Sequence, residues 1–515
     1  MAAGARALWG SKIGFLLAAI GSAIGLGNIW RFSYMAYEHG GGAFLVPYAV
    51  ALLVAGIPLM ILEYGLGHRE QASSPLAFAR VRVGWEWIGW AMPIMALFGI
   101  MLYYAVVIGW CINYLFYAVN QSWGGDPEGF FFKQFLQVSD SPFHLGGIRV
   151  PIASATFFVW FLCWVICFRE VNHGIEKACL IFMPLLFVLT LVLVGWTVSL
   201  PGAAQSIRNV YLKPDWHKIN LFTNPEARQV WIAAFGQIFF TLSLGFGIMI
   251  TYASYLPRKA DIVGNALWTS LVNCLYSFVA GFAVFGIVGF MAQAKGVGPA
   301  EVIRGGPGLA FVVYPAALQQ LPFGSRLFGF LFFLVLIIAG LSSGISLIEA
   351  FTCSLTDKFE WSRKATVSWI CLLGFLGSLI FTTRAGLLVL DIADHFITNY
   401  GLVTGGILEC LLVGWVLKAR LLRRHVGASG GMRLPALWDI LVKFITPAVL
   451  AVLVVNALLR ELARAYGGYH VDAVILFGVD WLLVCVAVAV AFTFSAWKPE
   501  KLVRVHRPEE EHLLT

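Results

Sequence analysis

The stretch Gly-Phe-Leu-Leu-Ala-Ala-Ile-Gly-Ser-Ala-Ile-Gly-Leu-Gly-Asn-Ile-Trp-Arg-Phe, residues 14–32, decides the fold. It is apolar enough to enter a membrane, yet Gly21, Gly25 and Gly27 interrupt it. Glycine weakens a helix, and an opened backbone at membrane depth is tolerated only where it lines a cavity or is buried in protein. The stretch therefore predicts a broken transmembrane helix that faces a ligand. Close helix packing through small residues is the alternative, but Asn28 and Arg31 favour a site because polar groups are costly at this depth.

The composition is that of a polytopic membrane protein. Of the 515 residues, 60% are hydrophobic and 12% are charged, whereas a soluble domain carries about 25% charged residues. The formal net charge of +8 is what the cytoplasmic loops of a membrane protein carry, so it implies no nucleic-acid partner. The nine cysteines lie mostly in apolar stretches, and we expect them to be packing residues. No N-terminal extension resembles a cleavable signal.

Apolar runs of about 20 residues predict twelve spans and an all-α integral membrane fold. The expected ranges are 11–37, 42–69, 88–121, 153–169, 176–199, 229–256, 261–292, 326–356, 365–383, 387–418, 437–459 and 473–497. An even number of spans puts both termini on one side, and the basic short loops on that side make it the cytoplasm. We therefore expect a multi-pass protein of the plasma membrane, the bacterial inner membrane. Residues 298–321, outside, are expected to form a short helical excursion towards a vestibule.

The sixth predicted span repeats the feature of the first, because Gly245 and Gly247 interrupt an apolar run beside Thr241 and Ser243. Paired broken helices in corresponding positions indicate two structural repeats with a substrate site at the bilayer midplane. The expected organisation is an N-terminus with the inner gate (1–10), two five-helix repeats (11–199 and 229–421), helices 11 and 12 (436–497) and a cytoplasmic tail (498–515). Half-helix amino ends favour an anionic group, and unwound carbonyls suit a cation.

Several further polar groups fall within or at the ends of the predicted spans. A carboxylate at membrane depth is a functional hypothesis by default, and this class contains Glu63, Glu349, Asp391, Asp394 and Glu409. Glu63 and Glu409 could instead brace neighbouring helices. The adjacent hydroxyls of Ser342 and Ser343 offer hard oxygens without thiolate or imidazole, a set that suits an alkali cation better than a transition metal.

Four runs of sequence resemble the neurotransmitter:sodium symporter family. They are Gly-Leu-Gly-Asn-Ile-Trp-Arg-Phe (25–32), Gly-Gly-Gly-Ala-Phe-Leu-Val-Pro-Tyr (40–48), Gly-Ile-Pro-Leu-Met (56–60) and Gly-Gln-Ile-Phe-Phe-Thr-Leu-Ser-Leu-Gly-Phe-Gly (236–247). The resemblance extends in order over all twelve spans, and the short termini are similar to those of bacterial members such as the bacterial leucine transporter. It implies a five-plus-five inverted repeat in which helices one and six are broken.

The resemblance also implies a substrate site and two sodium sites. Residues carried over to the substrate site are Ser22, Ala23, Gly27, Ile100, Tyr104, Phe240, Thr241, Ser243, Phe246, Ser343 and Leu347. The first sodium site would use the Ala23 carbonyl, Asn28, Thr241, Asn273 and the substrate's own carboxylate. The second would use the carbonyls of Gly21, Ile24 and Ala339 with the hydroxyls of Ser342 and Ser343.

The substrate implied is a neutral, apolar amino acid. Aminergic relatives carry an aspartate where this chain has Gly25, so we expect the substrate to supply its own carboxylate and not to be a monoamine. Ile100, Phe246 and Leu347 would leave an apolar pocket for its side chain. One alternative concerns the substrate, which could be an ω-amino acid or sulfonate osmolyte such as GABA or taurine. The other concerns the class of protein, which could be a substrate-gated channel or sensor. No nucleophile–base pair or metal set indicates an enzyme.

Ser277 stands where chloride-independent members of the family carry a glutamate. Two sodium ions and a zwitterion leave positive charge in a low-dielectric centre, which is costly unless it is balanced. A serine cannot balance it, so we expect chloride-dependent transport, with compensation by Glu63 or another carboxylate as the alternative. The resemblance places the chloride ion among Tyr48, Gln237, Thr241, Asn273 and Ser277.

Gates follow from the same resemblance. Outside, Arg31 and Asp394 would pair above the substrate, with Tyr104 and Phe240 forming a lid. Inside, Arg6 and Asp357 would pair, with Trp9 and Tyr255 nearby. An exposed pair of this kind contributes only about 0–1 kcal/mol, so it can break thermally, as alternating access requires. The protein is expected to be a monomer or a homodimer.

Overall fold

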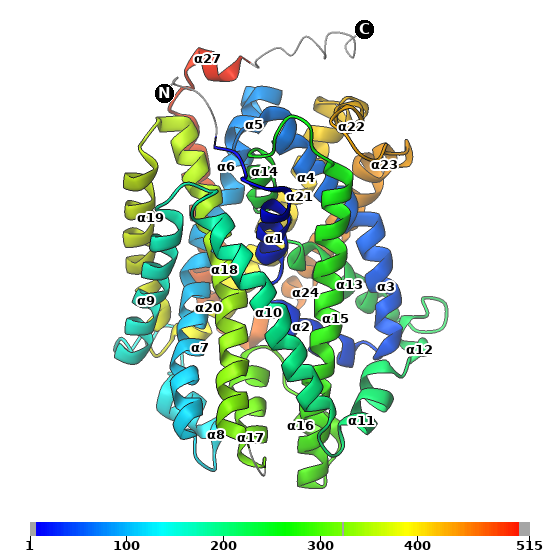
Figure 1. The fold of residues 1–515 in the computed structure, drawn as a ribbon, viewed down its shortest axis with the longest axis vertical. Helices are drawn as coiled ribbons and strands as arrows, with labels where there is room; N and C mark the ends of the chain where they lie inside the picture. The colour runs from blue at the N-terminus through cyan, green and yellow to red at the C-terminus, as the bar shows by residue number, and fades with distance from the viewer. Residues whose placement is uncertain (1–6, 322–323, 504–515) are drawn as a thin grey trace.

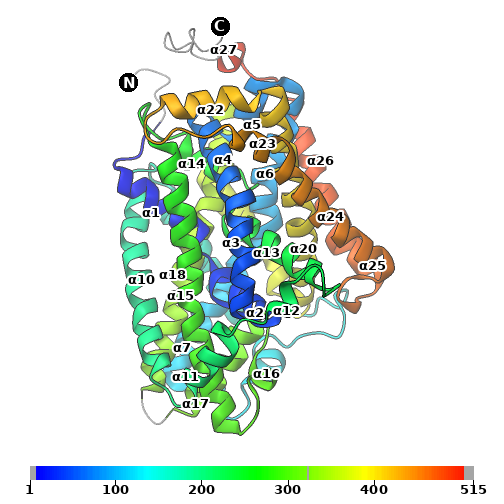
Figure 2. The ribbon, with the colours of Figure 1, turned by 90° about the vertical axis from the view of Figure 1, so that its right-hand side faces the viewer.

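The computed structural model describes residues 7–321 and 324–503, and these residues form a bundle of long helices (Figure 1). Their only β-structure is two isolated bridges, Gly41–Pro214 and Ile148–Thr383. The short helices α5 (Ser74–Val81), α22 (Ala419–Ala428) and α27 (Pro499–Leu502) gather at one end of the bundle (Figures 1 and 2). The expected all-helical fold is therefore confirmed for the described residues.

Ten helices of the described chain are long and apolar enough to cross a membrane, and one bent pair is an eleventh candidate. The ten are Gly42–Glu70, Val83–Asn120, Val150–Cys167, Ile175–Val198, Ile262–Lys295, Ser325–Phe359, Arg363–Thr382, Gly386–Val416, Leu437–Gly468 and Val471–Thr493. The chain is therefore a multi-pass membrane protein. The number twelve, the inverted repeat and the boundaries of the two repeats stay predictions.

Burial separates the central helices from the outer ones. In the most apolar window of Val83–Asn120, 89% of the residues are buried, and in that of Ser325–Phe359 the share is 83%. The same share is only 28% in Ile175–Val198 and in Val471–Thr493. The two central helices, α7 (Leu102–Asn120) and α18 (Ser325–Phe359), pack on each other. Because both outer helices are as apolar as the central ones, their exposed side chains must face lipid.

The first span is broken where the glycines predicted a break. Helix α1 (Lys12–Ala23) and helix α2 (Leu26–Glu38) bend by 52° at residues 24 and 25, which have extended backbone. The bend leaves the last carbonyls of α1 and the first amides of α2 without helical partners. These groups face the cavity described below.

The predicted sixth span is helical in two parts, α13 (Ala227–Thr241) and α14 (Ile248–Ala253). Residues 242–247 between them are not helical, and Gly245 and Gly247 have φ angles of +77° and +71°. Only glycine adopts this region at low cost, and a Cβ at Gly245 would also lie 2.9 Å from the carbonyl oxygen of Leu402. The two glycines are therefore needed for the break itself.

The expected excursion after residue 298 consists of α16 (Pro299–Val302), a π-helical turn (Leu309–Val313) and α17 (Tyr314–Gln319). Gly306 and Pro307, between α16 and the π-helical turn, line the central cavity. The prediction that this segment reaches towards a vestibule is consistent with that position.

Gly67 on α4 (Ile57–Glu70) provides a test of how α14 is held. A Cβ at Gly67 would lie 2.0 Å from the carbonyl oxygen of Ile250. We expect Gly67→Ala to lower the free energy of unfolding by about 1–3 kcal/mol, since overpacking forces backbone to shift. The measurement is thermal unfolding of the purified protein in detergent. Gly84→Ala, where a Cβ meets nothing within 4 Å, is the control, and equal losses in both variants would contradict the prediction.

Candidate functional site

A cavity of about 360 Å³ lies where the two helix breaks meet α7 and α18. The structure brings all eleven residues predicted for the substrate site to its wall: Ser22, Ala23, Gly27, Ile100, Tyr104, Phe240, Thr241, Ser243, Phe246, Ser343 and Leu347. None of these side chains is charged. Their contact with a substrate stays a prediction, but residues from four separate stretches of sequence do share one space.

The polar side of the cavity is built from the broken backbones. The Ser243 hydroxyl donates to the carbonyl of Ser22 at 3.1 Å, which ties the two breaks together. The amide of Leu26, at the amino end of α2, lies 3.4 Å from the Tyr104 hydroxyl. Because a helix amino end carries partial positive charge, this corner suits a carboxylate. The Ser22 and Ser346 hydroxyls are bonded to each other at 2.8 Å.

The five residues predicted for the second sodium site are held together at the first break. The Ser343 hydroxyl oxygen lies 3.5, 3.3 and 3.3 Å from the carbonyl oxygens of Gly21, Ile24 and Ala339. The Ser342 hydroxyl lies 3.0 Å from the Ala339 carbonyl, and a Cβ on Gly21 would lie 3.3 Å from the Cβ of Ser342. Five neutral oxygens and no nitrogen or sulfur ligand fit a hard monovalent cation.

Asn28 is the centre of a second polar cluster. Its side-chain amide nitrogen lies 3.0 Å from the Thr241 hydroxyl, 2.8 Å from Asn273 Oδ1 and 2.8 Å from the Ser277 hydroxyl. The Asn28 Oδ1 atom accepts from the backbone amide of Gly25 at 2.9 Å. The residues predicted for the first sodium site on α2, α13 and α15 (Ile262–Lys295) are therefore one network. Ala23, the remaining member, lies in the cavity wall.

Two residues predicted for the chloride site have buried polar atoms without a hydrogen bond of standard geometry to any described residue. These atoms are both polar atoms of the Gln237 carboxamide and the Tyr48 hydroxyl, on α3 (Leu45–Ala51), which lies close to Ser277 and Cys274. Helix α3 packs on α13, which carries Gln237, and α15, which carries Ser277, packs on α2. A buried donor without a partner costs about 1–3 kcal/mol, and hydroxyl and amide donors fit an anion.

The predicted outer gate residues both line the cavity but are not joined to each other. The Arg31 guanidinium lies over the Phe240 ring, 4.8 Å from its centroid. The Asp394 carboxylate accepts a hydrogen bond from Tyr103. No ion pair connects Arg31 with Asp394 in the part of the chain that the structure describes. Arg31 and Phe240 also line a second cavity of about 750 Å³, so they form the wall between the two spaces.

The predicted inner gate residues that the structure describes do not line the cavity, and their role as a gate stays a prediction. Arg6 lies outside the described residues. Trp9 is buried; its indole donates to the carbonyl of Tyr252 at 2.8 Å, and its backbone amide donates to the carbonyl of Tyr255 at 3.1 Å. The Asp357 carboxylate accepts from the backbone amide of Ser73 at 2.8 Å.

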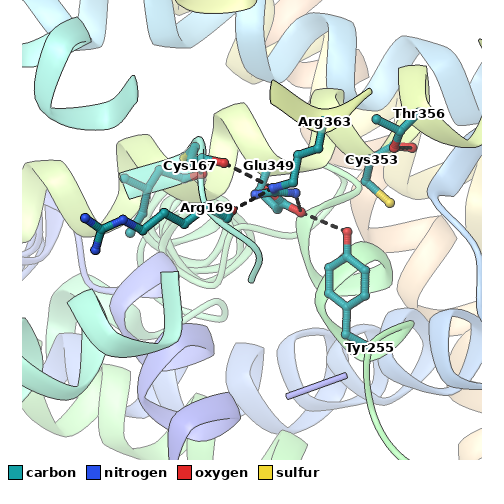
Figure 3. Close-up of polar contacts among 8 residues, drawn as sticks. Cys167, Arg169, Tyr255, Glu349, Cys353, Thr356 and Arg363 are labelled. Carbon is teal, nitrogen blue, oxygen red and sulfur yellow. Dashed lines mark hydrogen bonds and ion pairs between the residues drawn. The ribbon is translucent and has the colours of Figure 1, made fainter. Parts of the chain in front are cut away.

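Glu349 and Arg363 form an ion pair at this inner end that the sequence analysis missed (Figure 3). The Arg363 guanidinium donates to both carboxylate oxygens of Glu349, at 2.9 and 2.6 Å. The Tyr255 hydroxyl donates to the same carboxylate at 2.8 Å. The Arg363 Nε atom also donates to the carbonyls of Cys167 and Arg169, at 3.1 and 2.7 Å. The sequence signal was a membrane-depth carboxylate that required a cation, with a basic residue at the start of the next span.

Glu63 contacts the non-helical segment between α13 and α14. Its carboxylate accepts a hydrogen bond from the amide of Gly245 at 2.7 Å. The other Glu63 oxygen and both oxygens of Glu409 are buried and form no hydrogen bond with another described residue. Glu63 therefore contacts the unwound backbone directly. A bracing role between helices stays a prediction for Glu409.

Comparison with known proteins gives one consistent result over nearly the whole chain. The sequence model of the sodium:neurotransmitter symporter family matches residues 6–127 and 121–500. An uncharacterized sodium-dependent transporter of Methanocaldococcus jannaschii is 44% identical over 496 residues, which cover 96% of this chain and 99% of that protein. The sodium- and chloride-dependent GABA transporter 2 of Homo sapiens is 30% identical over 551 residues, 99% of this chain and 88% of that protein. The Macaca fascicularis transporter of the same name is also 30% identical, over 98% of this chain and 87% of its own length.

The Glu349–Arg363 pair gives a stability prediction. Glu349 is fully buried and Arg363 is 22% exposed, so removal of the carboxylate would leave a largely desolvated cation. We expect Glu349→Ala to reduce the free energy of unfolding by about 2–4 kcal/mol. The measurement is thermal unfolding in detergent. Glu128→Ala, at an exposed position, is the matched control, and an unchanged melting temperature in Glu349→Ala would show that the pair does not hold the inner end.

Proposed function

We propose that this chain, which belongs to the sodium:neurotransmitter symporter family, is a sodium-coupled importer of a neutral, apolar amino acid. The observation that carries the proposal is the cavity between the two helix breaks, where eleven uncharged predicted residues meet. Sodium that moves down its gradient would drive the substrate inwards. The names of relatives support sodium dependence, while the substrate is inferred from the chemistry of the cavity.

The proposed substrate lies with its carboxylate near Tyr104 and the amino end of α2. Its ammonium group would face the carbonyls near Ser22 and Phe240, and its side chain would contact Ile100, Phe246 and Leu347. A polar ω-amino acid or a sulfonate osmolyte needs additional hydrogen-bond donors at the end of the cavity that holds the second polar group of the substrate. The Ser22 hydroxyl is bonded to Ser346 and the Ser243 hydroxyl to the Ser22 carbonyl, which favours the apolar side chain. The GABA transporters among the relatives are the reason to retain the alternative.

Two sodium sites are proposed. The first lies at the Asn28 cluster, and the second lies among the oxygens around the Ser343 hydroxyl. The substrate carboxylate would complete the first sodium site, at Asn28, so that each ligand increases the affinity for the other. The neutral oxygens of Gly21, Ile24, Ala339, Ser342 and Ser343 support the second sodium site. When bound, the ions would supply positive charge that the carboxylate of the substrate partly neutralises.

Transport is proposed to proceed by alternating access between an outer gate at Arg31 and Asp394 and an inner gate around Trp9, Tyr255 and Asp357. The basic loops support a cytoplasmic location for the inner gate and both termini. A substrate-gated channel or sensor is the second candidate, and the residues predicted to form a gate at each end favour the transporter. Around the predicted inner gate, the Trp9 ring packs on Tyr252 and Tyr255 and Glu349 pairs with Arg363, whereas Arg31 and Asp394 are not joined.

Uptake into proteoliposomes tests the function. Under an inward sodium gradient with chloride present, we expect concentrative uptake of an apolar α-amino acid from a labelled pool that includes GABA and taurine. Uptake should vanish when the sodium gradient is collapsed by an ionophore, which is the control. Accumulation of GABA or taurine alone would contradict the apolar pocket and leave the symport mechanism standing. Substrate binding without sodium-driven accumulation would favour the channel or sensor.

Chloride dependence is proposed from the side chains around Ser277. The Gln237 carboxamide provides a buried donor without a partner among the described residues, and the Tyr48 hydroxyl lies beside Ser277 without a hydrogen bond of standard geometry. Asn273 and Ser277 are fully buried on α15. An anion among these groups would offset the charge of two sodium ions, which the uncharged residues of the substrate site do not. The printed names of the GABA transporter relatives also include chloride dependence.

Complete replacement of chloride by gluconate should lower sodium-driven uptake by at least about an order of magnitude, because unbalanced charge at low dielectric is costly. We expect Ser277→Glu to transport without chloride, because its carboxylate would replace the anion. Ser277→Gln, similar in size but neutral, should not. Wild-type uptake that is unchanged in gluconate would contradict the proposal and point to Glu63 or another carboxylate as the compensating charge.

A further inference from the structure

A groove of about 630 Å³ lies away from the transport cavity, between the end of α9 (Val150–Cys167) and the start of α19 (Arg363–Ser378). The two helices pack side by side. Arg363 is three residues beyond Glu360, which pairs with Lys498 next to α27, so the groove opens at the end of the bundle that carries α27. This is the proposed cytoplasmic end, at the boundary of the membrane.

The helices below the groove present a lipid-facing surface. Large apolar side chains along them are about half exposed: Phe157, Phe158, Trp369, Leu372, Leu373 and Leu376 are between 47% and 61% exposed. Both helices are candidate membrane spans, so these side chains lie against acyl chains. A lipid molecule whose chains follow this surface would bring its headgroup to the groove.

The groove itself combines aromatic and basic side chains. Trp164 and Phe168 form its apolar part. Three basic residues, Arg169, Arg363 and Lys364, and one acidic residue, Glu170, line the rest, and the charge of Arg363 is already compensated by Glu349. The charged ends of Arg169 and Lys364 make no ion pair with any other residue that the structure describes, although Lys364 lies over the Phe168 ring at 5.4 Å. Aromatic rings beside cations at the membrane boundary are typical of contacts with anionic headgroups.

Arg363, which lines the groove, is also the centre of the polar contacts around Glu349 (Figure 3). Arg363 is bound by Glu349 on one side and by the carbonyls of Cys167 and Arg169 on the other. The Arg169 guanidinium points away from Glu349 in Figure 3, so the Glu349 carboxylate does not compensate its charge. We propose that this groove binds the phosphate headgroup of an anionic phospholipid. The bound headgroup strengthens the arrangement in which Arg363 joins α9 to α18.

Phosphatidylglycerol is the probe that tests this site. The full chain is delipidated in detergent, and its melting temperature is measured against increasing phosphatidylglycerol or, separately, phosphatidylcholine. We expect phosphatidylglycerol to stabilise the wild type and phosphatidylcholine to have no comparable effect. Arg169→Gln with Lys364→Gln should weaken phosphatidylglycerol binding on the order of tenfold or more, because each basic residue near the surface attracts anionic lipid.

Matched variants distinguish lipid binding in the groove from a general effect of positive charge and from loss of folding. Arg258→Gln with Lys259→Gln removes the same two residue types from exposed positions in another loop and should bind as the wild type does. Arg169→Lys with Lys364→Arg keeps both charges and should restore binding. Equal weakening in both glutamine pairs, or equal stabilisation by the two lipids, would overturn the proposal. Equal protection by millimolar inorganic phosphate would overturn the lipid as occupant and indicate a free anion.

Discussion

The structure depends on one constraint: a peptide group at membrane depth must be paired by protein, because hydrocarbon offers no partner. Two spans are opened in the middle, at residues 24–25 and 242–247. The exposed amides are then taken up by side chains from neighbouring positions. The amide of Gly25 is bonded to Asn28, and that of Gly245 is bonded to Glu63. The polar residues around the cavity therefore have a structural role first, because they pair the backbone groups that the two helix breaks expose.

The same requirement explains why the cavity residues come from straight helices as well as broken ones. Ser343 lies on α18, a continuous helix of 35 residues, and its hydroxyl reaches the carbonyls at the break of the first span. Asn273 and Ser277 lie on α15, a continuous helix of 34 residues, and meet Asn28 on the opened span. The continuous helices thus fix the distances between the side-chain oxygens. The opened backbones supply carbonyl and amide groups that a regular helix would use in its own hydrogen bonds.

The two breaks could be predicted from the sequence because glycines in an apolar run weaken a helix at the depth where hydrocarbon most requires one. Eleven residues could be placed around one cavity because short motifs carry over between members of a family. The Glu349–Arg363 pair was missed, since 14 residues separate its members and the geometry of the turn at Glu360 decides whether they meet. The family resemblance also implied a pair between Arg31 and Asp394, whereas in this structure the long arginine side chain lies over Phe240. Spacing in a sequence fixes where a side chain begins, and local packing fixes where its charged end lies.

The carboxylate of Glu349 has two kinds of partner, a bidentate guanidinium and a single phenolic hydroxyl. A movement that withdraws Tyr255 would break one hydrogen bond and leave the charge of Glu349 compensated by Arg363. No ion is stranded in the low-dielectric interior, so the step avoids the large penalty of an unpaired buried charge. Ions in solution screen exposed charges far more strongly than buried ones. Because Glu349 is fully buried, the contact between Glu349 and Tyr255 should respond less to the ionic strength of the solution than an exposed ion pair would.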